Sequence, residues 1–288
     1  MPLSIVTGAT GGLGYETALG LARAGHAVVM TGRDAGRGAT ALRLARAAVP
    51  GADIRFASLD VANLAAVKAF AETVTDPIDV LVNNAGVMAL PRRELTVDGF
   101  ERQLGTNYLG HFALTARLRE PLRGGRVVNV ASLAHRRGRI AFADLQGARR
   151  YDPWTAYAQS KLAMLMFGIE LQARSVAGGW GIVGMAAHPG WSATSIVLNG
   201  PGAKAPGLRA RIMQAGFNAL GQSAADGALP ILYAALDTAA VPGGYYGPCC
   251  WNETRGRPTA SKIMPQAQDA LARAQLWQAS EALTLAFA

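Results

Sequence analysis

Short apolar segments alternate with longer helical patterns along most of this chain, and this alternation limits its fold more than any other feature. The apolar segments are residues 3–7, 26–31, 54–59, 78–82, 126–131 and 181–187. Helical spacing fills the intervals, at residues 12–24, 35–49, 63–74, 100–118 and 155–177, and returns at 265–285. Strands that alternate with helices predict an α/β fold, a doubly wound parallel sheet with helices on both faces. Such strands are apolar on both sides, as these are.

Composition supports one folded domain. Half of the 288 residues are hydrophobic and 16% are charged, which excludes a disordered chain. No linker and no internal repeat divides the sequence, so we interpret residues 1–288 as a single domain. Lys and Arg number 28 against 19 Asp and Glu, a net charge of +9. The arginines are scattered, so we expect no nucleic-acid partner.

Cysteine usage and hydropathy predict a cytoplasmic protein. Cys249 and Cys250 are adjacent in a Gly/Pro-rich stretch, which excludes a disulfide framework and a zinc site. We interpret them as two small loop residues rather than as a redox pair. The N-terminus lacks the features of a signal peptide, and no run of about 18 apolar residues is free of charges or breaks, so we expect no membrane span.

The first predicted strand runs into a glycine-rich turn, Thr7-Gly8-Ala9-Thr10-Gly11-Gly12-Leu13-Gly14. Glycines let the backbone turn sharply and approach a pyrophosphate, and the start of the next helix offers unpaired N–H groups to that anion. A position between strand and helix is the context that a dinucleotide site requires. The residues of this turn predicted to bind the dinucleotide are Gly8, Thr10, Gly12, Leu13 and Gly14.

The end of the second strand distinguishes NADP from NAD. An NAD site usually places an acid here for the ribose 2′-OH, and that acid would repel a 2′-phosphate. This sequence has Gly32 and then Arg33, whose guanidinium suits a 2′-phosphate. Asp34 lies twenty residues after Gly14, where the NAD acid is expected, but it also directly precedes a helix. We interpret Asp34 as the cap of that helix and predict NADP(H) in preference to NAD(H).

Two further strand ends complete the predicted cofactor site. After the third strand, the Asp60 carboxylate could accept a hydrogen bond from an adenine amino group, and Val61 offers its backbone. The alternative for Asp60 is a cap of the helix near residue 63. The fourth strand ends in Asn83-Asn84-Ala85-Gly86. Its asparagines could tie neighbouring strands together, and its small residues leave room for a ribose.

Four polar residues are candidates for the chemistry. Tyr157 and Lys161 lie four residues apart in a predicted helix and share one face. A nearby ammonium, helped by a nicotinamide cation, favours the phenolate and would lower the pKa of Tyr157 from its ordinary value of about 10. Ser132 ends the fifth strand, where its hydroxyl could bind a carbonyl oxygen. Asn107 lies inside the helix before that strand, either as part of a proton path to Lys161 or as an exposed polar residue.

Together these residues resemble the short-chain dehydrogenase/reductase family over about residues 3–195. The matching elements, in order, are the turn at 7–14, Asp60, the run at 83–86, Asn107, Ser132, the pair Tyr157 and Lys161, and Pro189-Gly190 followed by Thr194. The resemblance implies a Rossmann-type fold. It also implies a mainly cofactor-binding half at residues 1–130 and a catalytic and substrate-binding half at 131–288.

The resemblance also implies roles for these side chains. Tyr157 would be the general acid/base, and Ser132 would orient the carbonyl. Lys161 would hold the ribose and tune Tyr157, and Asn107 would support the proton relay. The stretch from Pro189-Gly190 to Thr194 would hold the nicotinamide carboxamide. Tyr157 and Lys161 thus count among the cofactor-binding residues as well.

An insertion sets this chain apart from the commonest members of the family. Ser132 and Tyr157 are 25 residues apart, and residues 135–154 form the extra segment. Its length, with the run His188-Pro189-Gly190-Trp191, resembles the branch of retinol dehydrogenases and protochlorophyllide reductases, whose members typically use NADPH and bulky apolar carbonyls. The arginines of the insertion could contact an anionic substrate or a membrane surface. We interpret them as solvated loop charges.

A substrate pocket and a lid are the least constrained predictions. The side chains predicted to line the pocket are Met88, Ala134, Tyr151, Trp154 and Trp191. Their alternative is ordinary core packing. Residues 195–242 look helical but are broken by Gly and Pro, and they follow the sixth strand, where ligands bind. They could form a substrate lid or plain core helices.

These observations predict an NADP(H)-dependent oxidoreductase that acts on the carbonyl or alcohol of a bulky, mainly apolar small molecule, without a metal. One alternative is the reduction of an activated C=C bond. Another is a non-catalytic dinucleotide-binding sensor, which would be expected to lose Tyr157, Lys161 or Ser132. The resemblance further implies a homodimer or a homotetramer.

Overall fold

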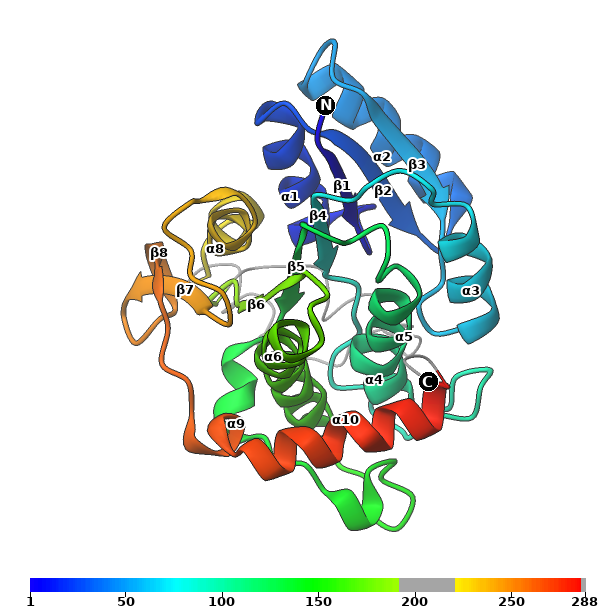
Figure 1. Cartoon of the computed structure of the whole chain (residues 1–288), viewed down its shortest axis with the longest axis vertical. Helices are drawn as coiled ribbons and strands as arrows, with labels where there is room; N and C mark the ends of the chain where they lie inside the picture. Colours follow the sequence, from blue (N-terminus) through cyan, green and yellow to red (C-terminus); the bar gives the residue numbers. More distant parts are fainter. Residues whose placement is uncertain (192–220, 286–288) are drawn as a thin grey trace, which may run out of the picture.

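The computed structural model describes residues 1–191 and 221–285. Its eight strands form one sheet in the order β3-β2-β1-β4-β5-β6-β7-β8 (Figure 1). The strands are β1 (Leu3–Val6), β2 (Ala27–Gly32), β3 (Ile54–Ser58), β4 (Val80–Asn83), β5 (Arg126–Val130), β6 (Val183–Ala187), β7 (Tyr245–Cys250) and β8 (Arg255–Ala260). All neighbours pair in parallel except β7 and β8, which are antiparallel. The predicted doubly wound parallel sheet is confirmed, with all six predicted strands in place.

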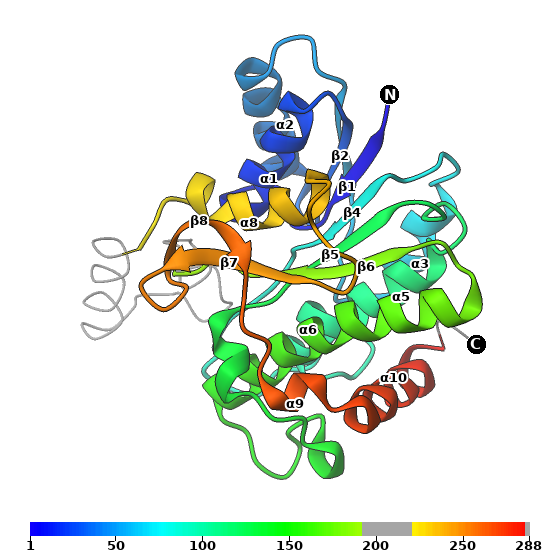
Figure 2. The ribbon, with the colours of Figure 1, turned by 60° about the vertical axis from the view of Figure 1, so that its left-hand side comes forward.

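Helices cover both faces of this sheet, because its central strands are apolar on both sides. One face carries α1 (Gly12–Arg23), α2 (Ala35–Ala48) and α8 (Ala224–Leu236). The other carries α3 (Leu64–Glu72), α4 (Arg102–Leu104), α5 (Gly110–Arg117) and α6 (Pro153–Gly178). Beyond α6 lie α9 (Pro265–Gln268) and α10 (Ala270–Thr284), an outer layer seen in Figure 2. The two faces hold separate apolar clusters, with Ile231 in the first and Phe112, Phe167 and Trp277 in the second.

Side-chain caps fix where several helices begin. Asp34 precedes α2 and accepts a hydrogen bond from the Arg37 N–H at 2.9 Å, so the interpretation of Asp34 as a cap is confirmed. Asn63 caps α3 in the same way. Asp152, which precedes Pro153 in the first turn of α6, accepts from the Thr155 N–H. A proline suits that position because its missing N–H would have no partner there.

The helix predicted over residues 100–118 is not regular. It starts with α4, widens into a π-helical turn at Gly105–Leu109 (η1), and continues as α5. A Cβ at Gly110 would collide with the backbone oxygen of Val61, so only glycine permits this close approach. Such single π-helical turns are frequent at functional sites, and this one contains Asn107.

The β7–β8 hairpin was not predicted, and the interpretation of Cys249 and Cys250 as loop residues is wrong. Both cysteines lie at the end of β7, where Cys250 pairs with Arg255 of β8 and Cys249 lies at a register shift. The sequence lacks a strand signal here because β8 is largely exposed and carries Arg255, Arg257 and Pro258 in place of apolar alternation. Proline and charge are typical of an edge strand, and β8 is the edge of the sheet.

Part of the predicted lid is a core helix. The segment 195–242 includes α8, whose Ala228, Ile231 and Ala234 are buried against the sheet. A Cβ at Gly20 of α1 would meet Leu232 of α8, which shows how closely the two helices pack. Residues 195–220 of the predicted lid lie outside the described residues. In the part of the chain that the structure describes, no helix is long and apolar enough to cross a membrane.

Candidate active site

The glycine-rich turn forms a cradle at the carboxyl end of β1. Gly8 has a φ of +67°, and a Cβ at this position would lie 2.8 Å from the Ala85 Cα. A Cβ at Gly14 would meet the Asn84 side chain and the Gly8 carbonyl. Both positions therefore require glycine. The backbone of the turn lies open to a cavity at the N-terminus of α1, the position where an anionic pyrophosphate is favoured.

This cavity, of about 240 Å³, brings together eleven of the sixteen residues predicted for the dinucleotide. The predicted residues that line it are Gly8, Thr10, Gly12, Leu13, Gly14, Arg33, Asp60, Val61, Asn84, Ala85 and Gly86. Sequence reasoning missed Arg37, Leu59, Val87 and Thr106, which line it as well. Gly11 and Gly32, which it quoted without assigning them to the site, and Asp34, which it used only as a cap, also line it. Arg37 lies in the first turn of α2, directly after β2, so it starts from the same edge of the sheet as the other lining residues. That position in the sequence is a signal that would have identified it.

A buried hydroxyl joins the ends of β1 and β4 beneath this cradle. Thr7 Oγ1 accepts hydrogen bonds from the Asn84 and Ala85 N–H groups at 2.8 and 2.9 Å. Asn84 Nδ2 donates in return to the Thr7 carbonyl at 2.7 Å. One strand further, Asn83 Nδ2 donates to Asn129 Oδ1 at 2.9 Å. The expectation that these asparagines tie neighbouring strands together is confirmed.

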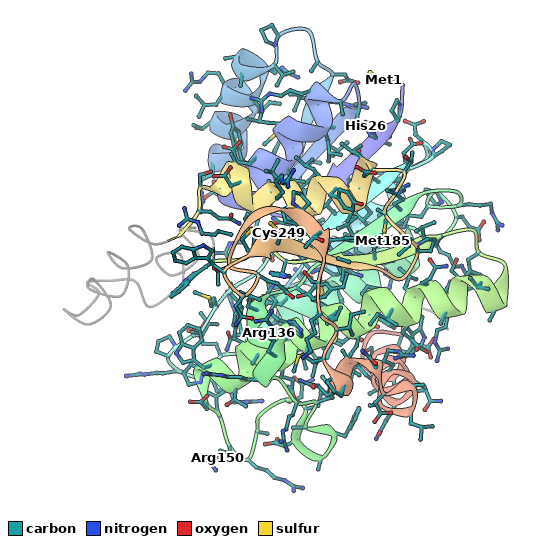
Figure 3. The ribbon with its side chains drawn as sticks, turned by 90° about the vertical axis from the view of Figure 1, so that its left-hand side faces the viewer. Met1, His26, Arg136, Arg150, Met185 and Cys249 are labelled. Atoms are coloured by element: carbon teal, nitrogen blue, oxygen red, sulfur yellow. The ribbon has the colours of Figure 1, made fainter. Side chains whose placement is uncertain are left out.

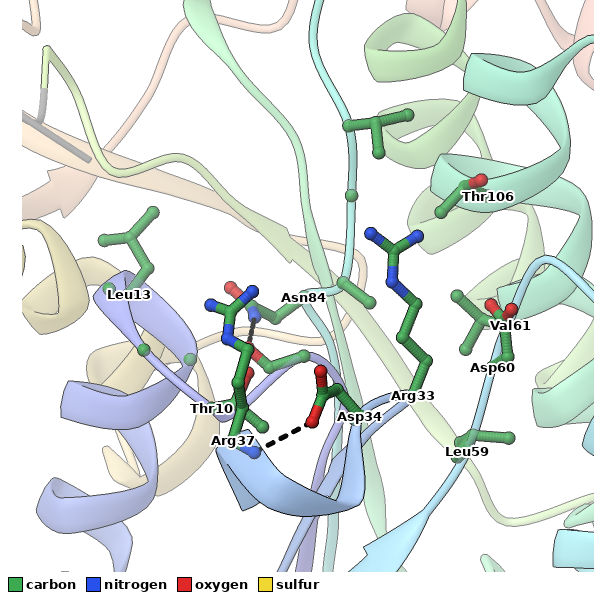
Figure 4. A pocket seen from close by; sticks show the side chains of 18 residues that line it. Thr10, Leu13, Arg33, Asp34, Arg37, Leu59, Asp60, Val61, Asn84 and Thr106 are labelled. Atoms are coloured by element: carbon green, nitrogen blue, oxygen red, sulfur yellow. Dashed lines mark hydrogen bonds between the residues drawn. The ribbon is translucent and has the colours of Figure 1, made fainter. Parts of the chain in front are cut away.

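Two arginines border the part of the cavity beside β2. Figure 4 shows the guanidinium groups of Arg33 and Arg37 on either side of Asp34, both directed into the pocket. One Asp34 oxygen is used by the Arg37 N–H as the helix cap. Asp60 lines the cavity, where its contact with an adenine stays a prediction, and it accepts from the Ala62 N–H at 3.0 Å in the turn before α3. The alternative of Asp60 as the cap of that helix is wrong, because Asn63 is the cap. Beside β2 the cavity thus carries two cations and one anion, Asp34, and Asp60 adds a second carboxylate after β3.

A second cavity, of about 260 Å³, adjoins the first and shares Leu13, Asn84, Gly86 and Val87 with it. Ser132, Tyr157 and Lys161 all line it, together with Pro189 and Gly190 of the loop after β6. The strand end, the helix and the loop that carry these residues are distant in sequence, so the parallel sheet brings them to one edge. Thr194, the last residue predicted for the nicotinamide, lies outside the described residues.

Burial controls the protonation of Tyr157 and Lys161. It raises the pKa of Tyr157, against which a hydrogen bond with Ser132 acts. It also lowers the pKa of Lys161 to about 8. Lys161 Nζ donates to the Val130 carbonyl at 2.8 Å and lies 5.9 Å from the centre of the Tyr157 ring. Burial thus shifts the pKa of Tyr157 in the direction opposite to the lowering expected from the Lys161 ammonium together with a nicotinamide cation, and that expectation stays a prediction.

Asn107 is buried, and its side chain is fully engaged within the protein. Its Oδ1 accepts from the Val87 N–H at 2.8 Å, and its Nδ2 donates to the Val87 carbonyl and to Ser160 Oγ, both at 2.9 Å. The alternative of an exposed polar residue is excluded. Its backbone carbonyl accepts from His111 Nδ1 at 3.0 Å. Asn107 thus fixes the segment after β4, which borders both cavities, against α6.

The predicted substrate residues separate into two groups. Met88, Ala134, Trp154 and Trp191 line the second cavity. Tyr151 does not, because its hydroxyl donates to the Leu90 carbonyl and accepts from Gln103 Nε2, each at 2.9 Å. Thr254, from the turn between β7 and β8, lines the cavity and was missed, since that hairpin gave no strand signal.

The arginines of the insertion behave differently from one another. Arg149 and Arg150 are exposed, as expected of solvated loop charges. Arg136 instead forms an ion pair with Glu253 of the β7–β8 turn, with 2.9 Å between Nη2 and Oε2. Glu253 Oε2 also lies 3.2 Å from the Nε2 of His188, which is buried. The insertion is therefore tied to the hairpin and to the strand end that precedes Pro189.

A doubly wound sheet whose carboxyl edge carries a glycine cradle and a serine–tyrosine–lysine cluster defines a nicotinamide-dinucleotide oxidoreductase of Rossmann type. The family model described as short chain dehydrogenase matches residues 3–199. The chain belongs to this family.

The relatives fall in the retinol-dehydrogenase-like branch of the family. Mouse polyprenol dehydrogenase is 46% identical over 198 residues, which cover 65% of this chain and 59% of that protein. The match thus spans less than two thirds of that relative. Mouse retinol dehydrogenase 12 is 37% identical over 263 residues, covering 88% of this chain and 80% of the relative.

Solved structures agree with the fold of this family. An uncharacterized protein from Mycobacterium paratuberculosis is 40% identical, with a TM-score of 0.81 over 99% of this chain and 94% of that chain. An actinorhodin polyketide ketoreductase variant, solved with NADPH, is 25% identical, with a TM-score of 0.61 over 85% of this chain and 94% of that chain.

Proposed function

We propose that this chain is an NADP(H)-dependent dehydrogenase that transfers hydride between the nicotinamide and the carbonyl or alcohol of a bulky, mainly apolar substrate. The observation that carries the proposal is the position of Ser132, Tyr157 and Lys161 on one cavity that adjoins the glycine cradle. Two of the relatives are named for retinol and polyprenol, which are both bulky apolar alcohols. The cavity lining of Met88 and two tryptophans suits such a substrate.

The cradle residues fit a phosphorylated dinucleotide. Gly8 and Gly14 let the turn pack closely against Ala85 and Asn84 so that its backbone lines the cavity, and the N-terminus of α1 faces that cavity. Arg33 and Arg37 offer two guanidinium groups beside β2, where a ribose 2′-phosphate would lie. This pair of cations supports NADP(H) over NAD(H). The cofactor, once bound, supplies the hydride that is exchanged with the substrate carbon.

The polar side chains of the second cavity would handle the oxygen and its proton. The Ser132 hydroxyl would donate a hydrogen bond to the carbonyl oxygen and hold it beside Tyr157. Because burial raises the pKa of Tyr157, the phenol keeps its proton, as a general acid in carbonyl reduction must. The Lys161 ammonium, which donates to the Val130 carbonyl, would stabilise the Tyr157 phenolate left after proton transfer and would bind the ribose. Asn107 would be a positioning residue, because its side chain holds the backbone of Val87, which lines both cavities.

The direct test is NADPH oxidation, followed spectroscopically, with a panel of bulky apolar aldehydes, ketones and enones. NADH is compared at equal concentration. Identification of the product separates the two chemistries, because carbonyl reduction gives an alcohol and C=C reduction leaves the carbonyl. Alcohol formation with a preference for NADPH supports the proposal. Tight NADPH binding without turnover on any member of the panel would favour a dinucleotide-binding sensor.

A further inference from the structure

The β7–β8 hairpin carries two thiols in contact. The sulfur atoms of Cys249 and Cys250 lie 2.6 Å apart, and both residues are exposed. Neighbouring side chains of a regular strand point to opposite faces. Here a register shift between Pro248 and Cys250 interrupts the pairing with β8, and the two sulfurs converge. Figure 3 shows Cys249 on this hairpin.

The facing strand is shaped around the two sulfurs. A Cβ at Gly256 would lie 2.9 Å from Cys249 Sγ and 3.0 Å from Cys250 Sγ. Gly256 also has a φ of +113°, a backbone conformation that residues other than glycine rarely adopt. The hairpin thus provides a space that both thiols share, open to solvent.

The surroundings make the two thiols unequal. The hydrogen bond from Cys250 lowers the pKa of Cys249, and the backbone N–H and charge of Arg257 act in the same direction. The same hydrogen bond raises the pKa of Cys250. Cys249 is therefore the better thiolate, and Cys250 the thiol that donates to it. A thiolate is the nucleophile in thiol–disulfide exchange.

We propose that Cys249 and Cys250 form a reactive dithiol that a small-molecule disulfide oxidises to a disulfide between the two neighbours. The Cys249 thiolate attacks one sulfur of the oxidant, whose S–S bond breaks and releases one thiol. Cys250 then attacks the sulfur of Cys249 in the mixed disulfide and releases the second thiol. Two electrons and two protons pass from the dithiol to the oxidant, which ends as two thiols.

Reduction returns the pair to its starting state. Neighbouring Cα atoms lie about 3.8 Å apart across a trans peptide, whereas unstrained disulfides span ~4.4–6.8 Å. A disulfide between Cys249 and Cys250 is therefore strained, and strained, exposed disulfides are the ones that small thiols reduce readily. The site is suited to reversible modification rather than to a structural cross-link.

The same hairpin reaches the proposed substrate cavity. The Thr254 N–H donates to the Cys250 carbonyl at 3.1 Å, and the Thr254 carbonyl accepts from the Trp191 N–H at 2.7 Å. Thr254 and Trp191 both line the cavity. Closing the disulfide alters the backbone at Cys250, so we expect oxidation to change KM for the substrate. This consequence rests on the proposed function, whereas the thiol chemistry does not.

The test treats the whole protein with oxidised glutathione and measures its mass without reductant. The chain has only two cysteines, so an intramolecular disulfide has one possible assignment. We expect a monomer that has lost the mass of two hydrogens and recovers it with dithiothreitol. An unreacted protein, a stable glutathione adduct of the wild type, or a covalent dimer as the main product would each overturn the proposal.

Single variants separate the two roles. Cys250→Ser keeps the attacking sulfur and should accumulate a stable glutathione adduct at the wild-type rate. Cys249→Ser should form its adduct several-fold more slowly, and equal rates would overturn the assignment of Cys249 as nucleophile. Turnover is then measured on the oxidised and reduced wild type. Disulfide formation without a change in KM would reject the link to the cavity while leaving the dithiol chemistry intact.

Discussion

Arg136 and Glu253 form an ion pair of 2.9 Å that joins the segment after Ser132 to the turn between β7 and β8. The same carboxylate meets His188 Nε2, and His188 Nδ1 accepts from the Gly190 N–H at 3.1 Å. Nε2 therefore carries the imidazole proton and donates it. One carboxylate thus connects three segments that border the second cavity.

We expect Glu253→Gln to lower the free energy of unfolding by about 1–3 kcal/mol at neutral pH, since it leaves buried His188 and partly buried Arg136 less well paired. Glu72→Gln is the matched control, because its ion pair with Lys68 is exposed at 3.9 Å and should contribute almost nothing. Urea unfolding of the three proteins measures both effects. Equal losses in the two variants would contradict the role of Glu253.

The contribution of Glu253 should also depend on pH. Burial by itself raises the pKa of Glu253, but hydrogen bonds from His188 and the Lys262 N–H, with the charge of Arg136, lower it from 4.5 to about 2. A lowered folded-state pKa stabilises the fold above 4.5, and this stabilisation is lost as the pH falls toward 2. The stability difference between the wild type and Glu253→Gln should therefore narrow across that range. A difference that stays constant would show that the carboxylate charge is not its source.

The two arginines beside β2 should decide between the cofactors. Arg33→Ala and Arg37→Ala each remove a guanidinium from the cavity, and a charged hydrogen bond contributes about 1.5–3 kcal/mol. We expect KM for NADPH to rise about tenfold or more in each variant, with KM for NADH nearly unchanged. Arg43→Ala is the control, because Arg43 is exposed and lies in α2, the helix that also carries Arg37. A parallel rise for NADH would mean that the arginines do not contact a 2′-phosphate.

The glycine cradle offers a matched pair of substitutions. Gly8→Ala places a methyl group on a residue with a φ of +67° and against Ala85. We expect the free energy of unfolding to fall by about 1–2 kcal/mol or more, and NADPH binding to weaken. At Gly11, a Cβ would meet no protein atom within 4 Å, so Gly11→Ala should leave the thermal midpoint nearly unchanged. Thermal unfolding and a binding titration of both variants compare them. Equal midpoints would contradict the strain at Gly8.

The sequence predicted those parts of the molecule that regular patterns determine. Buried parallel strands, the Asp34 cap and the asparagines at the end of β4 follow from apolar runs and from short polar residues at strand ends. The β7–β8 hairpin could not be predicted in this way, because an exposed edge strand with prolines has no periodic signal. Neither could the raised pKa of Tyr157, which depends on burial supplied by segments distant in sequence.

The most direct measurement compares the wild type with Tyr157→Phe in NADPH-dependent reduction of an active aldehyde or ketone, with NADPH binding titrated in parallel. The variant keeps the ring and removes the hydroxyl that would supply the proton. We predict that kcat falls about 10²–10⁴-fold while the Kd for NADPH stays close to that of the wild type. Turnover within a few-fold of the wild type would contradict the role of Tyr157 as the general acid and, with it, the proposed reaction.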